Sequence, residues 1–246
     1  MVDFVIFAAT QRTGSTLVQR LFNTNPHTMM WGEAGQALVK VLGMQAQAMK
    51  FSDASRGYRD SWLKDRDPAQ DISCLAPAPR FIHAATVAAA RAFVDGLYPP
   101  QDGIRTGFKE VNLPPQLVDI LQAAFPAMQP VFLTRHPADA WRSTPTDWPI
   151  SLNQFLHTWK RNTEGYAERG RLLWLEDVIR DPDTRAYLAG LAGITPDDYD
   201  KTLNINVNST PASNPRPVDE QMHVAQECRH LIPDHIHDRW LAKQNR

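Results

Sequence analysis

The hydrophobic positions of this chain gather in four short runs separated by longer mixed segments. Each run is a few residues long, rich in Val, Ile, Leu, Phe or Trp, and followed by residues typical of loops. The runs lie at residues 4–9, 104–109, 130–134 and 172–175. Their length and composition predict buried strands.

Between these runs, apolar residues return at the spacing of one helix face. The clearest example is the set Leu152, Phe155, Leu156 and Trp159, and a second is the set Leu117, Val118 and Leu121. Strands that alternate with helices predict an α/β fold. We expect a single three-layer domain, with a central parallel sheet of about four to five strands and helices on both faces.

Residues 34–100 differ from the rest, because they are rich in Ala, Gln and Met and contain no convincing strand. Within them, residues 84–97 predict one long helix and residues 67–79 predict a loop. We interpret 34–100 as a helical insertion, which either only packs on the domain or forms a lid or wall of a ligand site. Residues 204–217 are polar and interrupted by prolines, which predicts a loop, and residues 220–231 predict another helix.

Composition narrows the class of protein. The length of 246 residues suits one domain spanning 1–246, and 43% apolar residues suffice for a core. The 26 basic and 27 acidic residues nearly cancel, which argues against a broad nucleic-acid-binding surface. Cys74 and Cys228 lack a metal-ligand spacing and predict free thiols. Because we find neither a secretion signal nor a membrane span, we expect a cytoplasmic protein.

The first predicted strand leads through a tight loop, residues 10–16, into a predicted helix at 17–22. Gly14 permits an unusual backbone conformation and close approach of a ligand. The N–H groups of the first helical turn lack partners and favour an anion. Arg12 adds a planar cation, and Ser15 and Thr16 add hydroxyl donors. The segment predicts a phosphate site, and its structural alternative is a capped helix after a core strand.

This loop departs from the strict nucleotide-triphosphate loop. Ala9 stands at the first glycine position of that motif, and Ser15 stands at its lysine position. The missing lysine would contact the β- and γ-phosphates. The loop therefore favours a phosphate-bearing ligand other than a triphosphate with Mg²⁺.

A second candidate anion site follows the third predicted strand. Arg135 lies at the carboxyl end of that strand, the edge at which α/β proteins bind ligands. Pro137 suits the first turn of a helix, and Ser143 follows Arg135 by eight residues, or about two helical turns. Arg135 and Ser143 can therefore converge on a second phosphate. The structural alternative is an arginine that caps its own strand and a serine on the surface.

These segments resemble the sulfotransferase family. Residues 12–17 resemble its 5'-phosphosulfate loop, residues 133–137 with Ser143 resemble its 3'-phosphate motif, and residues 173–178 with Asp181-Pro182 resemble a third segment. Residues 23–27 resemble a turn of the carbohydrate and tyrosylprotein branches. His136 departs from the family, which commonly has aspartate there, and we expect this to affect a local turn.

The resemblance implies transfer of a sulfuryl group from 3'-phosphoadenosine-5'-phosphosulfate (PAPS) to a hydroxyl. The product nucleotide is 3'-phosphoadenosine-5'-phosphate (PAP), and no metal is required. It implies a set of nucleotide-binding residues: Arg12, Thr13, Gly14, Ser15, Thr16, Leu17, Arg135, Ser143, Ser209, Thr210 and Arg216. The last three would close over the adenine and the 3'-phosphate, and residues 34–100 would shape the acceptor site.

The resemblance also suggests catalytic roles. Glu33, in a Trp-Gly-Glu sequence, is our candidate general base, and Arg12 and Lys109 are candidates for stabilising the leaving group. Glu33 could instead interact with the dipole of a helix that begins at Ala34, and Lys109 could form a salt bridge with Glu110 or Glu176. The alternative bases are the histidines His27, His83 and His157.

Two other functions stay open from the sequence. One is a metal-dependent nucleotide or small-molecule kinase with a degenerate phosphate loop. The other is a non-catalytic nucleotide-binding protein of the same fold. The sequence leaves the acceptor open among small-molecule, carbohydrate, lipid and peptide hydroxyls, and it does not indicate an oligomeric state.

Overall fold

A computed structural model describes residues 2–66, 69, 75–205 and 216–244 of the chain. Its centre is one sheet of five parallel strands in the order β2-β3-β1-β4-β5. The strands are β1 (Val2–Ala8), β2 (Thr28–Trp31), β3 (Arg105–Val111), β4 (Gln129–Thr134) and β5 (Leu172–Trp174). The central strand β1 pairs with β3 and β4, which places Ile6 beside Lys109 on one side and Val131 on the other.

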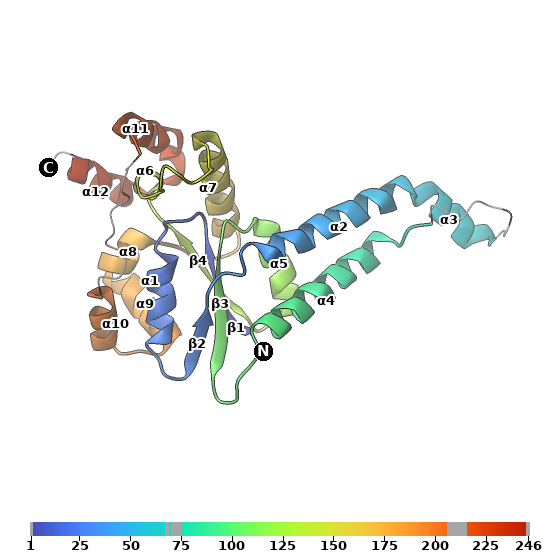
Figure 1. Ribbon diagram of the computed structural model, residues 1–246, viewed down its shortest axis with the longest axis horizontal. Helices are drawn as coiled ribbons and strands as arrows, with labels where there is room; N and C mark the ends of the chain where they lie inside the picture. Colours follow the sequence, from blue (N-terminus) through green and yellow to red (C-terminus); the bar gives the residue numbers. More distant parts are fainter. Residues whose placement is uncertain (1, 67–68, 70–74, 206–215, 245–246) are drawn as a thin grey trace.

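Helices cover both faces of this sheet (Figure 1). In chain order they are α1 (Ser15–Asn23), α2 (Ala37–Ala54), α3 (Arg56–Asp65), α4 (Pro79–Leu97), α5 (Pro115–Ala124), α6 (Pro137–Arg142), α7 (Leu152–Ala167), α8 (Leu175–Arg180), α9 (Pro182–Ala192), α10 (Pro196–Leu203), α11 (Val218–Glu227) and α12 (Asp234–Gln244), with a short 3-10 helix at Arg229–Leu231. In the part of the chain that is described, no helix is long and apolar enough to span a bilayer.

The side chains of β1 alternate between two separate cores. Phe4 and Ile6 pack on the face covered by α1, α9 and α10, where they join Phe22. Val5 and Phe7 pack on the opposite face, in the core that α5 completes. Burial on both faces explains why the sequence of β1 is almost wholly apolar. The predicted three-layer α/β fold with a parallel sheet is confirmed.

The fifth strand and several boundaries differ from the sequence prediction. β2 is only four residues long and is not among the four predicted strands. It pairs with β3 on one side, and on the other the Asn23 side chain bonds both the amide and the carbonyl of Met30. β3 extends two residues beyond the predicted end at Lys109 because Glu110 and Val111 still pair with β1. Lys109 therefore lies within the strand and does not close it.

The predicted helical insertion forms an arm that extends away from the sheet (Figure 1). Helices α2 and α4 lie side by side along the arm, and α3 lies at its far end. At the base, Leu38 and Val94 join the sheet core, and Tyr98 stacks on Phe108. Near the far end, the buried guanidinium of Arg59 donates to backbone carbonyls and to Ser52 Oγ. The arm is therefore stabilised by hydrogen bonds of its own as well as by its contacts with the sheet core.

Gly107 provides a test of how tightly β3 is packed. A Cβ at this position would lie 2.3 Å from Met30 Sδ and 2.7 Å from the carbonyl oxygen of Phe4. Because that carbonyl is backbone of the neighbouring strand, we expect Gly107→Ala to lower the free energy of unfolding by about 1–3 kcal/mol in urea denaturation. The matched control is Gly96→Ala on the exposed side of α4, where no atom lies within 4 Å. Equal urea midpoints for the two variants would contradict the prediction.

Candidate functional site

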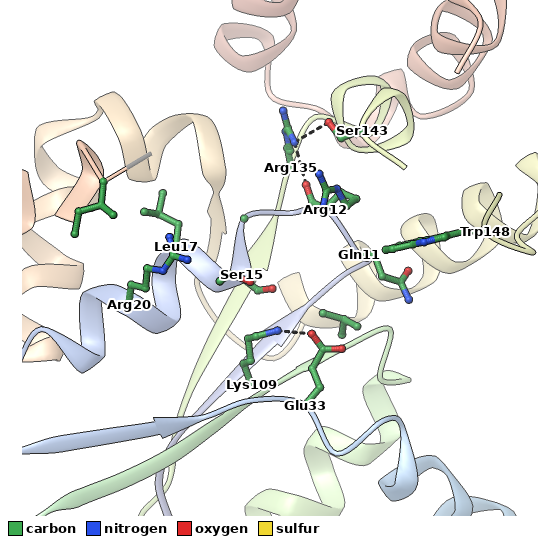
Figure 2. A pocket seen from close by; sticks show the side chains of 14 residues that line it. Gln11, Arg12, Ser15, Leu17, Arg20, Glu33, Lys109, Arg135, Ser143 and Trp148 are labelled. Atoms are coloured by element: carbon green, nitrogen blue, oxygen red, sulfur yellow. Dashed lines mark hydrogen bonds and ion pairs between the residues drawn. The ribbon is translucent and has the colours of Figure 1, made fainter. Parts of the chain in front are cut away.

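A cavity of about 500 Å³ opens where β1, β3 and β4 end (Figure 2). It is lined by nine residues that the sequence singled out: Arg12, Gly14, Ser15, Thr16, Leu17, Glu33, Lys109, Arg135 and Ser143. The parallel strands explain this convergence, because their carboxyl ends meet at one edge of the sheet. The structure thus gathers residues separated by up to 131 positions into one pocket.

The loop after β1 has an unusual backbone conformation beside the pocket. Arg12 and Gly14 both have positive φ angles, 66° and 83°. At Gly14 φ is positive and a Cβ would lie 2.5 Å from Leu175 Cδ1, so a larger residue would be strained and would have to displace the Leu175 side chain. The helix α1 begins at Ser15, directly after Gly14. The predicted strand–loop–helix is therefore present, with a helix N-terminus at the pocket.

Thr13, which the sequence placed among the nucleotide-binding residues, has a side chain that lies outside the cavity. It is fully buried, it donates to the carbonyl of Thr10 at 3.0 Å, and it does not line the cavity. Its side chain stabilises the loop from inside. Any ligand contact from Thr13 would have to come from its backbone amide.

Arg135 connects the two candidate anion sites. Its Nη1 donates to the backbone carbonyl of Arg12 at 3.0 Å and to Ser143 Oγ at 3.3 Å (Figure 2). Ser143 Oγ in turn donates to the carbonyl of Asp139 at 2.8 Å. Arg12 and Arg135 therefore face the same cleft, as the two motifs together predict.

Residues 173–178, the third segment that resembles the family, contact both loops without lining the cavity. Leu175 fills the space beside Gly14, and Glu176 Oε1 accepts from the amide of His136 at 3.2 Å. From helix α7, Trp159 Nε1 donates to the carbonyl of Arg135, and Asn162 Nδ2 donates to the carbonyl of Ala9. The ends of β1 and β4 are thus held in place by side chains that do not line the cavity.

Glu33 and Lys109 form an ion pair across the floor of the pocket (Figure 2). The side chain of Lys109 is 9% exposed and that of Glu33 is 38% exposed, so the carboxylate can meet a ligand. The alternative partners of Lys109, Glu110 and Glu176, do not pair with it. The alternative for Glu33 is also wrong, because α2 begins at Ala37 and has no acidic residue in its first turn.

Glu110, directly after Lys109, is a buried carboxyl group that fixes the backbone beside Glu33. Its Oε1 accepts from the amide of Ala34 at 2.7 Å, while its Oε2 has no hydrogen-bond partner. Burial raises the pKa of Glu110 to about 7, against the opposing effect of the Ala34 hydrogen bond. A group of this kind favours its protonated form, since a proton would reduce the cost of burying it.

His136, which we expected to affect only a local turn, contacts the C-terminal helix α12. Its ring is fully buried and stacks on Trp240 of α12 at 4.6 Å and on His237 at 5.6 Å. Burial lowers the pKa of His136 to about 3. The residue is therefore a neutral ring in the contact between the second anion loop and α12.

Several predicted residues lie elsewhere. Arg216 packs on the Trp141 ring at 4.3 Å and donates to the carbonyl of Pro145, and it does not line the cavity. Ser209 and Thr210 fall outside the described residues. Among the described residues of 34–100, none lines this cavity, and the same holds for the alternative bases His27, His83 and His157.

The cavity also contains residues that the sequence did not single out, namely Gln11, Arg20, Val111, Trp148 and Ile205. Arg20 follows Thr16 by one helical turn, so helical spacing could have indicated it. No comparable signal exists for Trp148, which lies in the loop between α6 and α7. Figure 2 shows Gln11 and Trp148 on one side of the loop at residues 12–16, with Leu17 and Arg20 on the other.

We also find, within the described ranges, no group of three or more His, Cys, Asp or Glu side chains placed to hold a metal ion.

The raised pKa of Glu110 predicts a pH dependence of stability. Between its ordinary value of 4.5 and about 7, the folded protein binds a proton that the unfolded chain releases. The free energy of unfolding should therefore fall as pH rises through this window, and Glu110→Gln should remove that part of the dependence. Urea denaturation between pH 5 and pH 8 should show wild type losing stability relative to Glu110→Gln. Parallel curves would contradict this, and Glu168→Gln at an exposed site is the control.

The family model described as "Sulfotransferase family" matches residues 5–183. No curated protein matches the chain in sequence. Two of the solved structures that resemble this chain have low sequence identity to it. The sulfotransferase domain from the Synechococcus PCC 7002 olefin synthase is 14% identical, with 95% of this chain and 98% of that chain covered and a TM-score of 0.42.

The second structure is sulfotransferase STF9 from Mycobacterium avium. It is 12% identical, with 93% of this chain and 76% of that chain covered, and its TM-score is 0.46. The match to the family model spans both candidate anion loops, residues 12–17 and 135–143, together with Glu33, Lys109 and residues 173–178. On that match, the chain belongs to the sulfotransferase family.

Proposed function

We propose that the protein transfers a sulfuryl group from PAPS to a hydroxyl group of an acceptor. One observation carries the proposal: Arg12 and Arg135, from two loops 123 residues apart, line one cavity and are joined by a hydrogen bond. A nucleotide phosphorylated at both the 5' and the 3' position would place one anion at each loop. Membership of the sulfotransferase family supports the choice of donor.

In this proposal the 5'-phosphosulfate lies on the loop from Arg12 to Leu17. The N–H groups at the start of α1 and the Ser15 hydroxyl would donate to it, and Arg12 would add charge. The 3'-phosphate would lie against Arg135 and Ser143. The loop lacks the lysine that contacts the outer phosphates of a nucleoside triphosphate, which disfavours ATP with Mg²⁺.

The chemistry assigned to Glu33 and Lys109 follows from their place at the pocket floor. Glu33 would accept the proton of the acceptor hydroxyl while the hydroxyl oxygen forms a bond to sulfur. The bond from sulfur to the bridging phosphate oxygen breaks, and PAP leaves with the extra negative charge. Lys109 and Arg12 would stabilise that charge, which is the main contribution a protein makes in transfers of this type.

Binding of the donor can be tested before an acceptor is known. We expect PAP to raise the melting temperature of the protein, and ATP with Mg²⁺ to raise it less, because only PAP places a phosphate at each loop. Arg135→Ala should reduce the shift by PAP more than the shift by adenosine 5'-phosphate. A larger shift with ATP and Mg²⁺ would support a kinase instead. Binding of PAP without turnover of any acceptor would support a non-catalytic protein.

Glu33 and Lys109 can be tested with labelled PAPS and the acceptor that a labelled-donor screen identifies. We expect Glu33→Gln and Lys109→Ala each to lower kcat by about 10²–10³, since each removes a group that acts in the transition state. Thermal melting should show that both variants stay folded. Glu168→Gln, at an exposed glutamate away from the pocket, is the control for the first substitution. Near-full activity of Glu33→Gln would remove Glu33 as the base.

A further inference from the structure

The C-terminal helix α12 packs against the outer side of the second anion loop. It lies beyond residue 183, where the family match ends. The rings of Trp240 and His237 stack on His136, and Ile236 and Trp240 are buried. Arg239 adds an ion pair with Asp177 of α8 at 2.8 Å. These contacts fix α12 relative to the loop that carries Arg135.

The last turn of α12 brings Lys243 to a buried carboxylate. Lys243 Nζ lies 3.0 Å from Asp139 Oδ2, and the side chain of Asp139 is only 2% exposed. Arg142 approaches the other oxygen, Oδ1, at 3.4 Å. Burial opposes ionisation of Asp139, but Arg135, Lys243 and Arg142 together hold its pKa below the ordinary value. Asp139 is therefore a carboxylate shared among three cations.

Arg135 is the cation farthest from Asp139. Its Nη2 lies 4.0 Å from Oδ2, the same oxygen that Lys243 contacts at 3.0 Å. A carboxylate this buried attracts the nearest available cation strongly, because little water screens the pair. Arg142 lies at the other oxygen, Oδ1, so the loss of Lys243 would leave Arg135 as the cation beside Oδ2. Its guanidinium would then be drawn toward Oδ2 and away from the cavity.

We propose that Lys243 is a positioning residue, which occupies Oδ2 of Asp139 and so leaves the Arg135 guanidinium free to bind the 3'-phosphate of the nucleotide. This inference rests on the proposed function, because it assumes that a 3'-phosphate binds at Arg135. Lys243 itself does not line the cavity, so in this proposal it does not contact the nucleotide. It acts through the charge of Asp139.

The test compares two nucleotides that differ only in the 3'-phosphate, PAP and adenosine 5'-phosphate, by calorimetry on the full chain. Lys243→Met keeps the apolar stem of the side chain and removes its charge. We expect this variant to raise the Kd of PAP about tenfold and to change the Kd of adenosine 5'-phosphate by less than about twofold. Lys243→Arg should restore PAP binding, because arginine can also contact Asp139. Lys201→Met, which removes an exposed ion pair with Asp198, is the matched control and should change neither Kd.

A second background separates this mechanism from a direct attraction between Lys243 and the phosphate. In Asp139→Asn the competing charge is absent, so adding Lys243→Met should leave the Kd of PAP unchanged. A further loss of PAP binding in the double variant would show that Lys243 acts on the phosphate directly, and would overturn the proposal. Melting temperatures identify any variant that is unfolded.

Two other results would also overturn the inference. One is an equal loss of affinity for both nucleotides in Lys243→Met, which would indicate a general structural role for α12. The other is unchanged PAP binding in that variant. A wild-type protein that does not prefer PAP over adenosine 5'-phosphate would instead refute the proposed donor site, so the two failures can be told apart.

Discussion

The site depends on one contact, the hydrogen bond from the Arg135 guanidinium to the backbone carbonyl of Arg12. It joins the loop after β1 to the loop after β4, and it is possible only because these strands are neighbours with parallel direction. The positive φ of Arg12 shapes the loop whose carbonyl accepts this bond. An unusual backbone conformation of a non-glycine residue costs free energy, and it persists here where the surrounding contacts require it. The hydrogen bond therefore joins the two candidate anion loops at one cavity.

Three buried carboxyl groups lie near the pocket without lining it: Asp139, Glu176 and Glu110. Asp139 Oδ2 lies 4.0 Å from Arg135 Nη2, Glu176 accepts from the amide of His136, and Glu110 accepts from the amide of Ala34. Such groups cost free energy to bury, and burial raises the pKa values of Glu110 and Glu176. In return, Glu110 and Glu176 orient backbone beside the cavity, and Asp139 lies close to Arg135.

The helical arm and the C-terminal helix α12 differ in their position relative to the cavity. The arm of α2, α3 and α4 extends away from the sheet, and its described residues do not line the cavity (Figure 1). The helix α12, in contrast, packs directly against the second anion loop through Trp240 and Lys243. We expected residues 34–100 to shape the acceptor site, but their described residues do not line this cavity. The C-terminal helix α12, for which the sequence suggested no role, contacts the loop of Arg135.

Local sequence indicated four of the five strands, the first loop and the second loop, because buried strands, a glycine in a tight turn and an arginine after a strand each carry a short-range pattern. It did not reveal β2, whose four residues owe their place to Asn23 and to pairing with β3. Nor did it reveal that Lys109 pairs with Glu33 rather than with Glu110, or that Trp148 reaches the pocket. These facts depend on which strand ends and loops meet in space, and contacts between residues far apart in the chain leave no periodic signal in the sequence. The sequence by itself therefore indicated most of the elements and the chemistry of their ends, and only the tertiary structure decided which charges lie close enough to act together.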